Sequence, residues 1–94
     1  MRLVWTLEAL EDRRAVFDYI EADNPSAALA LDERLSIKAT RLTDFPQLGH
    51  PGRVKGTREL TVHRHYLLVY DFAEDTVRVL RVLHSARQWP PEQC

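Results

Sequence analysis

The chain has 94 residues, a formal net charge of −1 and a single cysteine, Cys94. This length leaves room for one domain, which we expect to span residues 1–94 with a short C-terminal tail from about residue 85. A single cysteine excludes an internal disulfide framework, and no apolar run is long enough to span a membrane. We therefore expect a cytoplasmic protein without membrane contact.

The first half of the chain has the pattern of a strand followed by two helices. Arg2–Thr6 alternates like a short strand, and Thr6 can cap a helix that ends near Ala22. Asn24 and Pro25 suit the cap and the first residue of a second helix. The apolar side of that helix consists of Ala28, Leu31, Leu35, Ala39 and Leu42. Because the link is short, the helices should form an antiparallel hairpin.

The second half predicts three strands after an irregular segment. Residues 44–56 are rich in Pro and Gly, so we expect no regular element there. The strands are expected at Thr57–His65, Tyr66–Phe72 and Thr76–His84. The middle strand is almost wholly apolar, as in a strand buried on both faces. The predicted fold is therefore α+β, in the order β-α-α-β-β-β, with the helical hairpin on one face of a small antiparallel sheet.

Basic residues gather in the second half and supply candidate binding groups. Guanidinium groups bind phosphates or carboxylates through paired hydrogen bonds, and surface ion pairs are the simpler alternative. Strict alternation in the last strand places Arg78 with Val82 on one face and Arg81 with Val79 on the other, unless a bulge shifts the register. The candidates from this region are Arg58, Arg64, Arg81, His84 and Arg87.

The end of the chain combines His84, Arg87 and Trp89. A histidine can act as acid or base near neutral pH, and an arginine can stabilise charge on a phosphate, so the first two suit phosphodiester cleavage. The alternative is a polar end to a strand. Trp89 either anchors a partner or folds back onto the core, and we expect it to fold back.

Metal chemistry is weakly indicated. His63 and His65 are two positions apart, a spacing that can place two imidazoles on one metal, and His50 or His84 are conceivable further ligands. Exposed strand histidines are the simpler interpretation. The sequence also lacks a glycine-rich phosphate loop and a local nucleophile paired with a base. We expect neither a metal nor a cofactor.

Taken in order, several motifs resemble the RelE/ParE superfamily of toxins from type II toxin–antitoxin modules. The motifs are Val4-Trp-Thr-Leu-Glu-Ala-Leu-Glu-Asp, Phe17-Asp-Tyr-Ile20, Asn24-Pro25, Leu42-Thr-Asp-Phe-Pro-Gln-Leu-Gly-His-Pro-Gly52, Arg58-Glu-Leu, Tyr66-Leu-Leu-Val-Tyr70 and Val79-Leu-Arg-Val-Leu-His-Ser-Ala-Arg-Gln-Trp89. The resemblance covers nearly the whole chain. It implies a small cytoplasmic toxin that arrests growth and serves plasmid or chromosome maintenance.

The resemblance is closer to the ParE branch, whose members inhibit DNA gyrase, than to the RelE branch, whose members cleave mRNA on the ribosome. RelE-like nucleases usually carry an arginine after the first tyrosine of the Tyr66–Tyr70 motif, where this chain has Leu67. A leucine cannot hold a phosphate. The resemblance therefore implies a gyrase inhibitor that blocks DNA replication by binding, with no catalytic residue.

The resemblance also implies partners and a target-binding surface. A cognate ParD-like antitoxin is expected to fold onto the toxin, in a groove across the helical hairpin and the open sheet, and to make the contacts with operator DNA. The residues expected to bind the target are Arg58, Arg64, Arg81, His84, Arg87 and Trp89. The alternative is a ribosome-dependent mRNA interferase, an endoribonuclease with His84, Arg87 and Arg81 at its active site. A third possibility is an antitoxin-binding module without toxicity.

Overall fold

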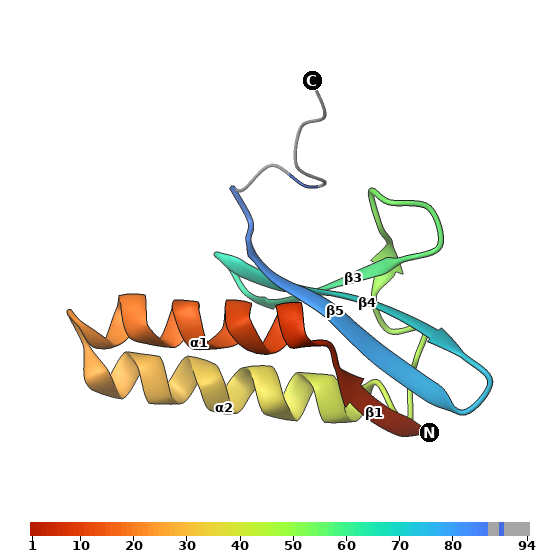
Figure 1. Cartoon of the computed structure of the whole chain (residues 1–94), viewed down its shortest axis with the longest axis horizontal. Coiled ribbons are helices and arrows are strands. Elements are labelled where there is room, and N and C mark those ends of the chain that lie inside the picture. The colour runs from red at the N-terminus through yellow and green to blue at the C-terminus, as the bar shows by residue number, and fades with distance from the viewer. Residues whose placement is uncertain (87–88, 90–94) are drawn as a thin grey trace.

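The computed structural model describes residues 1–86 and 89, which form two helices and a five-stranded sheet (Figure 1). The strands are β1 (Arg2–Trp5), β2 (His50–Pro51), β3 (Arg58–His63), β4 (Tyr66–Ala73) and β5 (Thr76–His84). The helices are α1 (Leu7–Glu21) and α2 (Pro25–Arg41). The strand order is β1-β5-β4-β3-β2, which places the apolar β4 at the centre. The predicted α+β class and helical hairpin are confirmed.

Both helices begin at the predicted caps. The Thr6 hydroxyl accepts a hydrogen bond of 3.1 Å from the backbone N–H of Ala9, and the Asn24 side chain accepts one of 3.1 Å from Ala27. Pro25 is the first residue of α2, where a missing N–H costs nothing. Neither helix of the described chain has the length and apolar character needed to cross a membrane.

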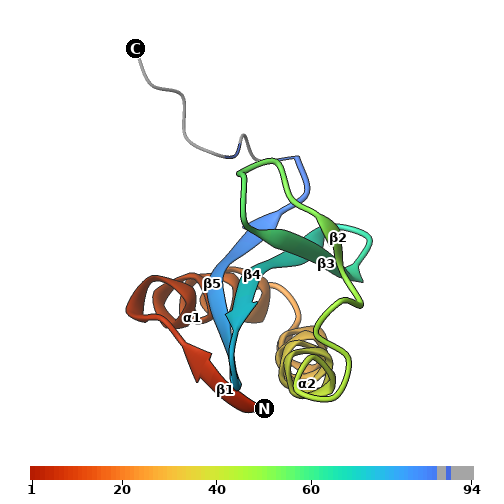
Figure 2. The same cartoon turned by 90° about the vertical axis from the view of Figure 1, so that its right-hand side faces the viewer.

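The helices pack on one side of the sheet, and the core lies between the two layers (Figure 2). Ala9, Leu31 and Leu35 of the helices meet Leu68 and other buried residues of the strands. Helix α2 buries the predicted side, because Ala28, Leu31, Leu35, Ala39 and Leu42 are all buried. Burial of a leucine of this kind contributes about 2 kcal/mol, so this layer is the main source of stability.

The sheet is mixed and not wholly antiparallel, which corrects the prediction. Strands β3, β4 and β5 are joined by short turns and pair antiparallel, as expected. Strand β1 pairs with β5 in parallel, with Leu3 opposite Val77 and Trp5 opposite Val79. Two helices separate β1 from the other strands, so no tight turn fixes its direction. A second difference is the short β2, which pairs with β3 inside the segment expected to be irregular.

A bulge in β5 changes which side chains face the helices. Val69 lies opposite Arg81 and the next residue of β4, Tyr70, lies opposite Val79, so Leu80 is the extra residue. Val79 and Val82 consequently share one buried cluster beneath the helices, although strict alternation would place them on opposite faces. The bulge that could shift the register of the last strand is therefore present, at Leu80.

Candidate functional site

Arg81, expected to bind the target, is paired with Asp12 of α1. Its guanidinium donates hydrogen bonds of 2.7 and 3.0 Å to the two carboxylate oxygens of Asp12. The same carboxylate accepts a 3.0 Å bond from the backbone N–H of Val82. These bonds to Asp12 raise the pKa of Arg81 above its ordinary value. Strand β1 pairs with β5 only as far as Val79, and beyond that point the Asp12 side chain accepts the hydrogen bond of the Val82 N–H. Helical periodicity does not reveal this role.

Arg58, also expected to bind the target, instead forms hydrogen bonds to backbone carbonyl oxygens of this chain. Its guanidinium donates to the carbonyl oxygens of Gly49, at 2.9 Å, and Gln47, at 3.2 Å. The buried Tyr70 hydroxyl fixes the same loop, because it donates to the Pro46 carbonyl at 2.7 Å and accepts from the Gly49 N–H at 2.8 Å. Arg58 therefore holds the segment between α2 and β3 against the sheet.

Two further predicted residues, Arg64 and His84, lie around the end of β5. Arg64 is exposed in the turn between β3 and β4, and its carbonyl accepts a 3.3 Å hydrogen bond from the Ser85 hydroxyl. His84 is the last residue of β5 and is exposed. Arg87 lies outside the described residues. Arg64 and His84 are therefore near one end of the β3–β4 hairpin, whereas Arg58 is near the other.

Trp89 folds back onto the face of the sheet opposite the helices, as predicted. It packs against a buried cluster of Leu67, Val69 and Leu83, with Leu80 beside it. The Arg81 guanidinium lies 5.5 Å from the centre of the Trp89 ring. The indole N–H is buried and has no hydrogen-bond partner among residues 1–86 and 89. We call Leu67, Val69, Leu80, Leu83 and Trp89 the far face.

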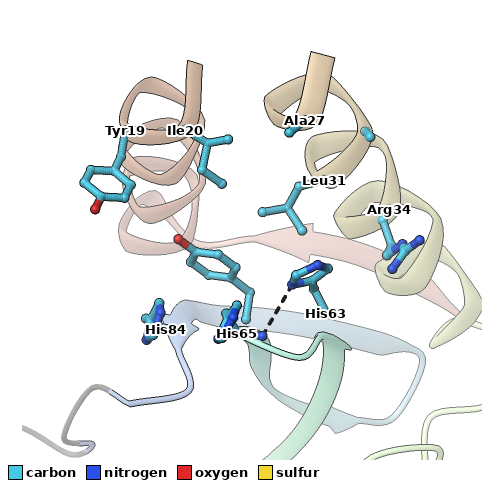
Figure 3. Close-up of a pocket in the computed structure, with 10 residues that line it drawn as sticks. Tyr19, Ile20, Ala27, Leu31, Arg34, His63, His65 and His84 are labelled. Carbon is cyan, nitrogen blue, oxygen red and sulfur yellow. Dashed lines mark hydrogen bonds between the residues drawn. The ribbon is translucent and has the colours of Figure 1, made fainter. Parts of the chain in front are cut away.

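A pocket of about 500 Å³ opens on the other side, between the helices and the β3–β4 hairpin (Figure 3). Its floor is apolar and its rim carries the side chains of Arg34, His63, His65 and His84. The full lining is Tyr19, Ile20, Ala27, Ala30, Leu31, Arg34, His63, His65, Tyr66 and His84. We call this the histidine pocket. His63 and His65 come from the β3–β4 hairpin, and His84 joins them from the end of β5, where it lies opposite Tyr66.

The histidine rings form a continuous row along the rim. The ring centres of His63 and His65 are 5.8 Å apart, and those of His65 and His84 are 5.5 Å apart with the planes nearly parallel. Tyr66 meets His84 edge-on at 5.2 Å. In this row the pKa of His65 is lowered, first by partial loss of solvent and then by the positive charges of Arg64, His84 and His63. Burial, and to a lesser extent Tyr19, raises the pKa of Tyr66.

The row does not have the form of a metal site. Among residues 1–86 and 89, no group of three or more His, Cys, Asp or Glu side chains is arranged to hold a metal ion. His65 and His84 stack with parallel planes, so their ring nitrogens do not converge on one point. His50 is exposed on β2, next to its neighbour's carbonyl, and does not line the pocket.

Comparison with known proteins decides the family. A family model described as ParE toxin of type II toxin-antitoxin system, parDE, matches residues 3–89. The chain belongs to the ParE toxin family. It is 39% identical over 90 residues to the protein Y4kP of Sinorhizobium fredii, covering 95% of this chain and 93% of that protein. It is 36% identical over 86 residues to Toxin RelE2 of Caulobacter vibrioides, covering 92% and 97%.

A solved structure gives the same assignment for the fold. The chromosomal ParDE toxin–antitoxin system from P. aeruginosa matches with a TM-score of 0.79 at 25% identity, over 89% of this chain and 95% of that chain. The resemblance to the RelE/ParE superfamily, closer to ParE, is therefore confirmed. This ParE-family chain is a toxin of a type II toxin–antitoxin system.

Proposed function

We propose that this toxin inhibits DNA gyrase by protein–protein binding and so blocks DNA replication and growth. The observation that carries the proposal is the apolar far face. Leu67, where RelE-like nucleases usually have an arginine, is only 7% exposed and packs with Val69 and Leu83. Hydrocarbon side chains cannot stabilise the charge that develops on a phosphate during RNA cleavage. Because these three side chains are already buried beneath Leu80 and Trp89, we propose that a protein target meets the two partly exposed side chains above them.

Trp89 and Arg81 are the anchors we propose for the target. Tryptophan and arginine are the residue types that most often dominate binding energy at protein interfaces. Here they lie together, with the guanidinium over the indole ring, and Asp12 fixes the position of Arg81. We propose Arg64 and His84 as further target contacts at the hairpin end of the sheet, where His84 also lines the histidine pocket. Arg58 holds the loop at the opposite end of the hairpin and supports the sheet from there.

The proposal includes a cognate ParD-like antitoxin that neutralises the toxin. The similar P. aeruginosa structure is of a ParDE toxin–antitoxin system, which supports a partner of this kind. The antitoxin folds on binding, with apolar side chains in a groove across the helical hairpin and the open sheet. Contacts between the complex and operator DNA come from the antitoxin.

One relative gives a reason to keep a second candidate function. The protein at 36% identity is named Toxin RelE2, and RelE-like toxins cleave mRNA on the ribosome. In that case His84 would act as acid or base, with Arg87 and Arg81 binding phosphate. Arg81 would then have to exchange its carboxylate partner, Asp12, for a phosphate. The two functions predict different first effects in cells.

The test follows DNA and protein synthesis by pulse labelling after induction of the toxin without antitoxin, and then measures supercoiling by purified gyrase. We expect DNA synthesis to stop first and supercoiling to be inhibited. Trp89→Ala should weaken inhibition at least about tenfold, as for a central anchor. Phe45→Ala, which removes an exposed aromatic ring outside the far face, is the matched control and should have no effect. Immediate loss of protein synthesis with cut messages and normal supercoiling would refute the proposal.

A further inference from the structure

The histidine pocket combines two surfaces of different chemistry. The floor is apolar, formed by residues such as Ile20, Leu31 and the tyrosine ring of Tyr66. Ala30 and Ala27, the latter drawn in Figure 3, have short side chains, so α2 leaves room above this floor. A volume of about 500 Å³ is enough for one or two side chains of a peptide, but a folded surface would need to insert a projecting segment.

The rim of the pocket carries basic groups and no carboxylate. Arg34 projects from α2, and the three histidines line the pocket from the hairpin and β5, with His63 drawn on the side of Arg34 and His84 on the side of Tyr19 (Figure 3). Within the described chain, Arg34 has no ion pair, in contrast to Arg13, Arg14, Arg53, Arg78 and Arg81. A guanidinium and a row of imidazoles around an apolar floor are complementary to a carboxylate next to an aliphatic side chain.

We infer that the histidine pocket binds an acidic segment of the antitoxin, with an aliphatic side chain on the floor and a carboxylate between Arg34 and the histidine row. This inference rests on the proposed function for the identity of the partner. A peptide segment fits better than the gyrase surface because the site is concave and small. Trp89, the anchor proposed for gyrase, packs on the opposite side of the sheet.

A carboxylate in this position couples binding to proton uptake. The pKa of His65 in the free toxin is lowered from its ordinary value of 6.5. A bound carboxylate favours the charged ring and raises that pKa, so the complex holds more protons than the free proteins. The affinity therefore increases as the pH falls through the bound-state pKa and levels off below the free-state pKa. Each histidine whose pKa rises by one unit contributes about tenfold.

Several charged and titratable groups surround the histidine row and set the electrostatic environment that a carboxylate of the antitoxin would change. They are Asp12 and Tyr19 of α1, Arg34 of α2, Arg64 of the hairpin turn, Tyr66 of β4 and Arg81 of β5. Asp12 is the carboxylate of this set, and it is already bonded to Arg81 and the Val82 N–H. The partner must therefore supply the negative charge that the histidine row lacks.

The first experiment uses the wild-type toxin and the full-length cognate antitoxin, co-expressed, separated in denaturant and refolded. The pKa of each histidine is measured by NMR in the free toxin and in the complex. We expect the pKa of His65 to rise on binding, and calorimetry to show tighter binding at pH 6 than at pH 8. An unchanged pKa of His65, or an affinity independent of pH, would overturn the inference without the need for any variant.

The second experiment uses variants with a matched control. Arg34→Gln and the double variant His63→Gln/His65→Gln, none of which lies among the residues proposed to contact gyrase, should each weaken antitoxin binding at pH 6 at least about tenfold. His50→Gln removes an exposed histidine outside the pocket and should leave binding unchanged. Thermal unfolding checks that every variant is folded.

The gyrase assay separates this inference from the proposed function. If the pocket variants lose antitoxin binding but still inhibit supercoiling, both proposals stand. If the variants bind antitoxin normally and fail only against gyrase, the pocket belongs to the target and the inference is wrong. If wild-type toxin does not inhibit gyrase but antitoxin binding retains the expected pH dependence, only the proposed function fails.

Discussion

The pairing of Arg81 with Asp12 should be one of the strongest side-chain interactions of this toxin. The two side chains are 22% and 13% exposed, and the Asp12 carboxylate accepts three hydrogen bonds. Asp12→Ala leaves the Arg81 charge and the Val82 N–H without this acceptor, so we expect a loss of about 2–3 kcal/mol in the free energy of unfolding. For a domain of this size, that loss lowers Tm by roughly 10–15 °C.

A double-mutant cycle with Asp12→Ala and Arg81→Gln isolates the pairwise contribution. Measured by urea unfolding, the coupling energy should be about 1–2 kcal/mol, since both side chains are mostly withdrawn from water. The chain offers a matched control in Arg14 and Asp18, which also form a pair but are 80% and 56% exposed. Their coupling should be below about 0.5 kcal/mol. Equal coupling in the two cycles would refute the structural role assigned to Asp12.

Three further changes test other parts of the molecule. Tyr70→Phe removes the hydroxyl that joins Pro46 to Gly49 and should cost about 2 kcal/mol in urea unfolding, whereas a loss below about 0.5 kcal/mol would show that the loop is not held there. Gly49→Ala should also destabilise the fold, because its new methyl group would lie 2.7 Å from the Glu59 carbonyl; unchanged thermal unfolding would contradict this close approach. The lowered pKa of His65 means that the unfolded chain binds more protons, so stability is fully present above about pH 6.5 and falls as the pH drops through the folded pKa. His65→Gln should make the free energy of unfolding, measured in urea, less dependent on pH between about pH 8 and pH 5. An unchanged pH dependence would show that it does not come from His65.

The features that were predictable from sequence depend on neighbouring residues. Thr6 and Asn24 cap their helices because a cap needs only the next few backbone N–H groups. The alternation of β3 and the apolar run of β4 likewise give their burial directly. Such local signals were enough to place every main helix and strand within a few residues.

The features that the sequence did not reveal depend on distant parts of the chain. The parallel pairing of β1 with β5, and the bulge at Leu80, are set by strand neighbours that local patterns do not specify. Nothing in the local pattern distinguishes Asp12 from the other acids of α1, because its partner Arg81 is 69 positions away. The histidine pocket was missed for the same reason. His63 and His65 gave the only local signal, and their neighbour His84 joins them through the end of β5.

The pairing of the first strand with the last has a consequence for synthesis of the toxin. Thr6 donates its hydroxyl hydrogen bond to the Leu80 carbonyl, 74 positions later, and β1 has its partner only once β5 has been made. A growing chain can form the helical hairpin early, but it cannot complete the sheet on which those helices pack. Folding that depends on such distant contacts is comparatively slow. An unfinished polypeptide therefore lacks both the far face and the histidine pocket. The toxin can reach its folded form only after translation of β5 is complete.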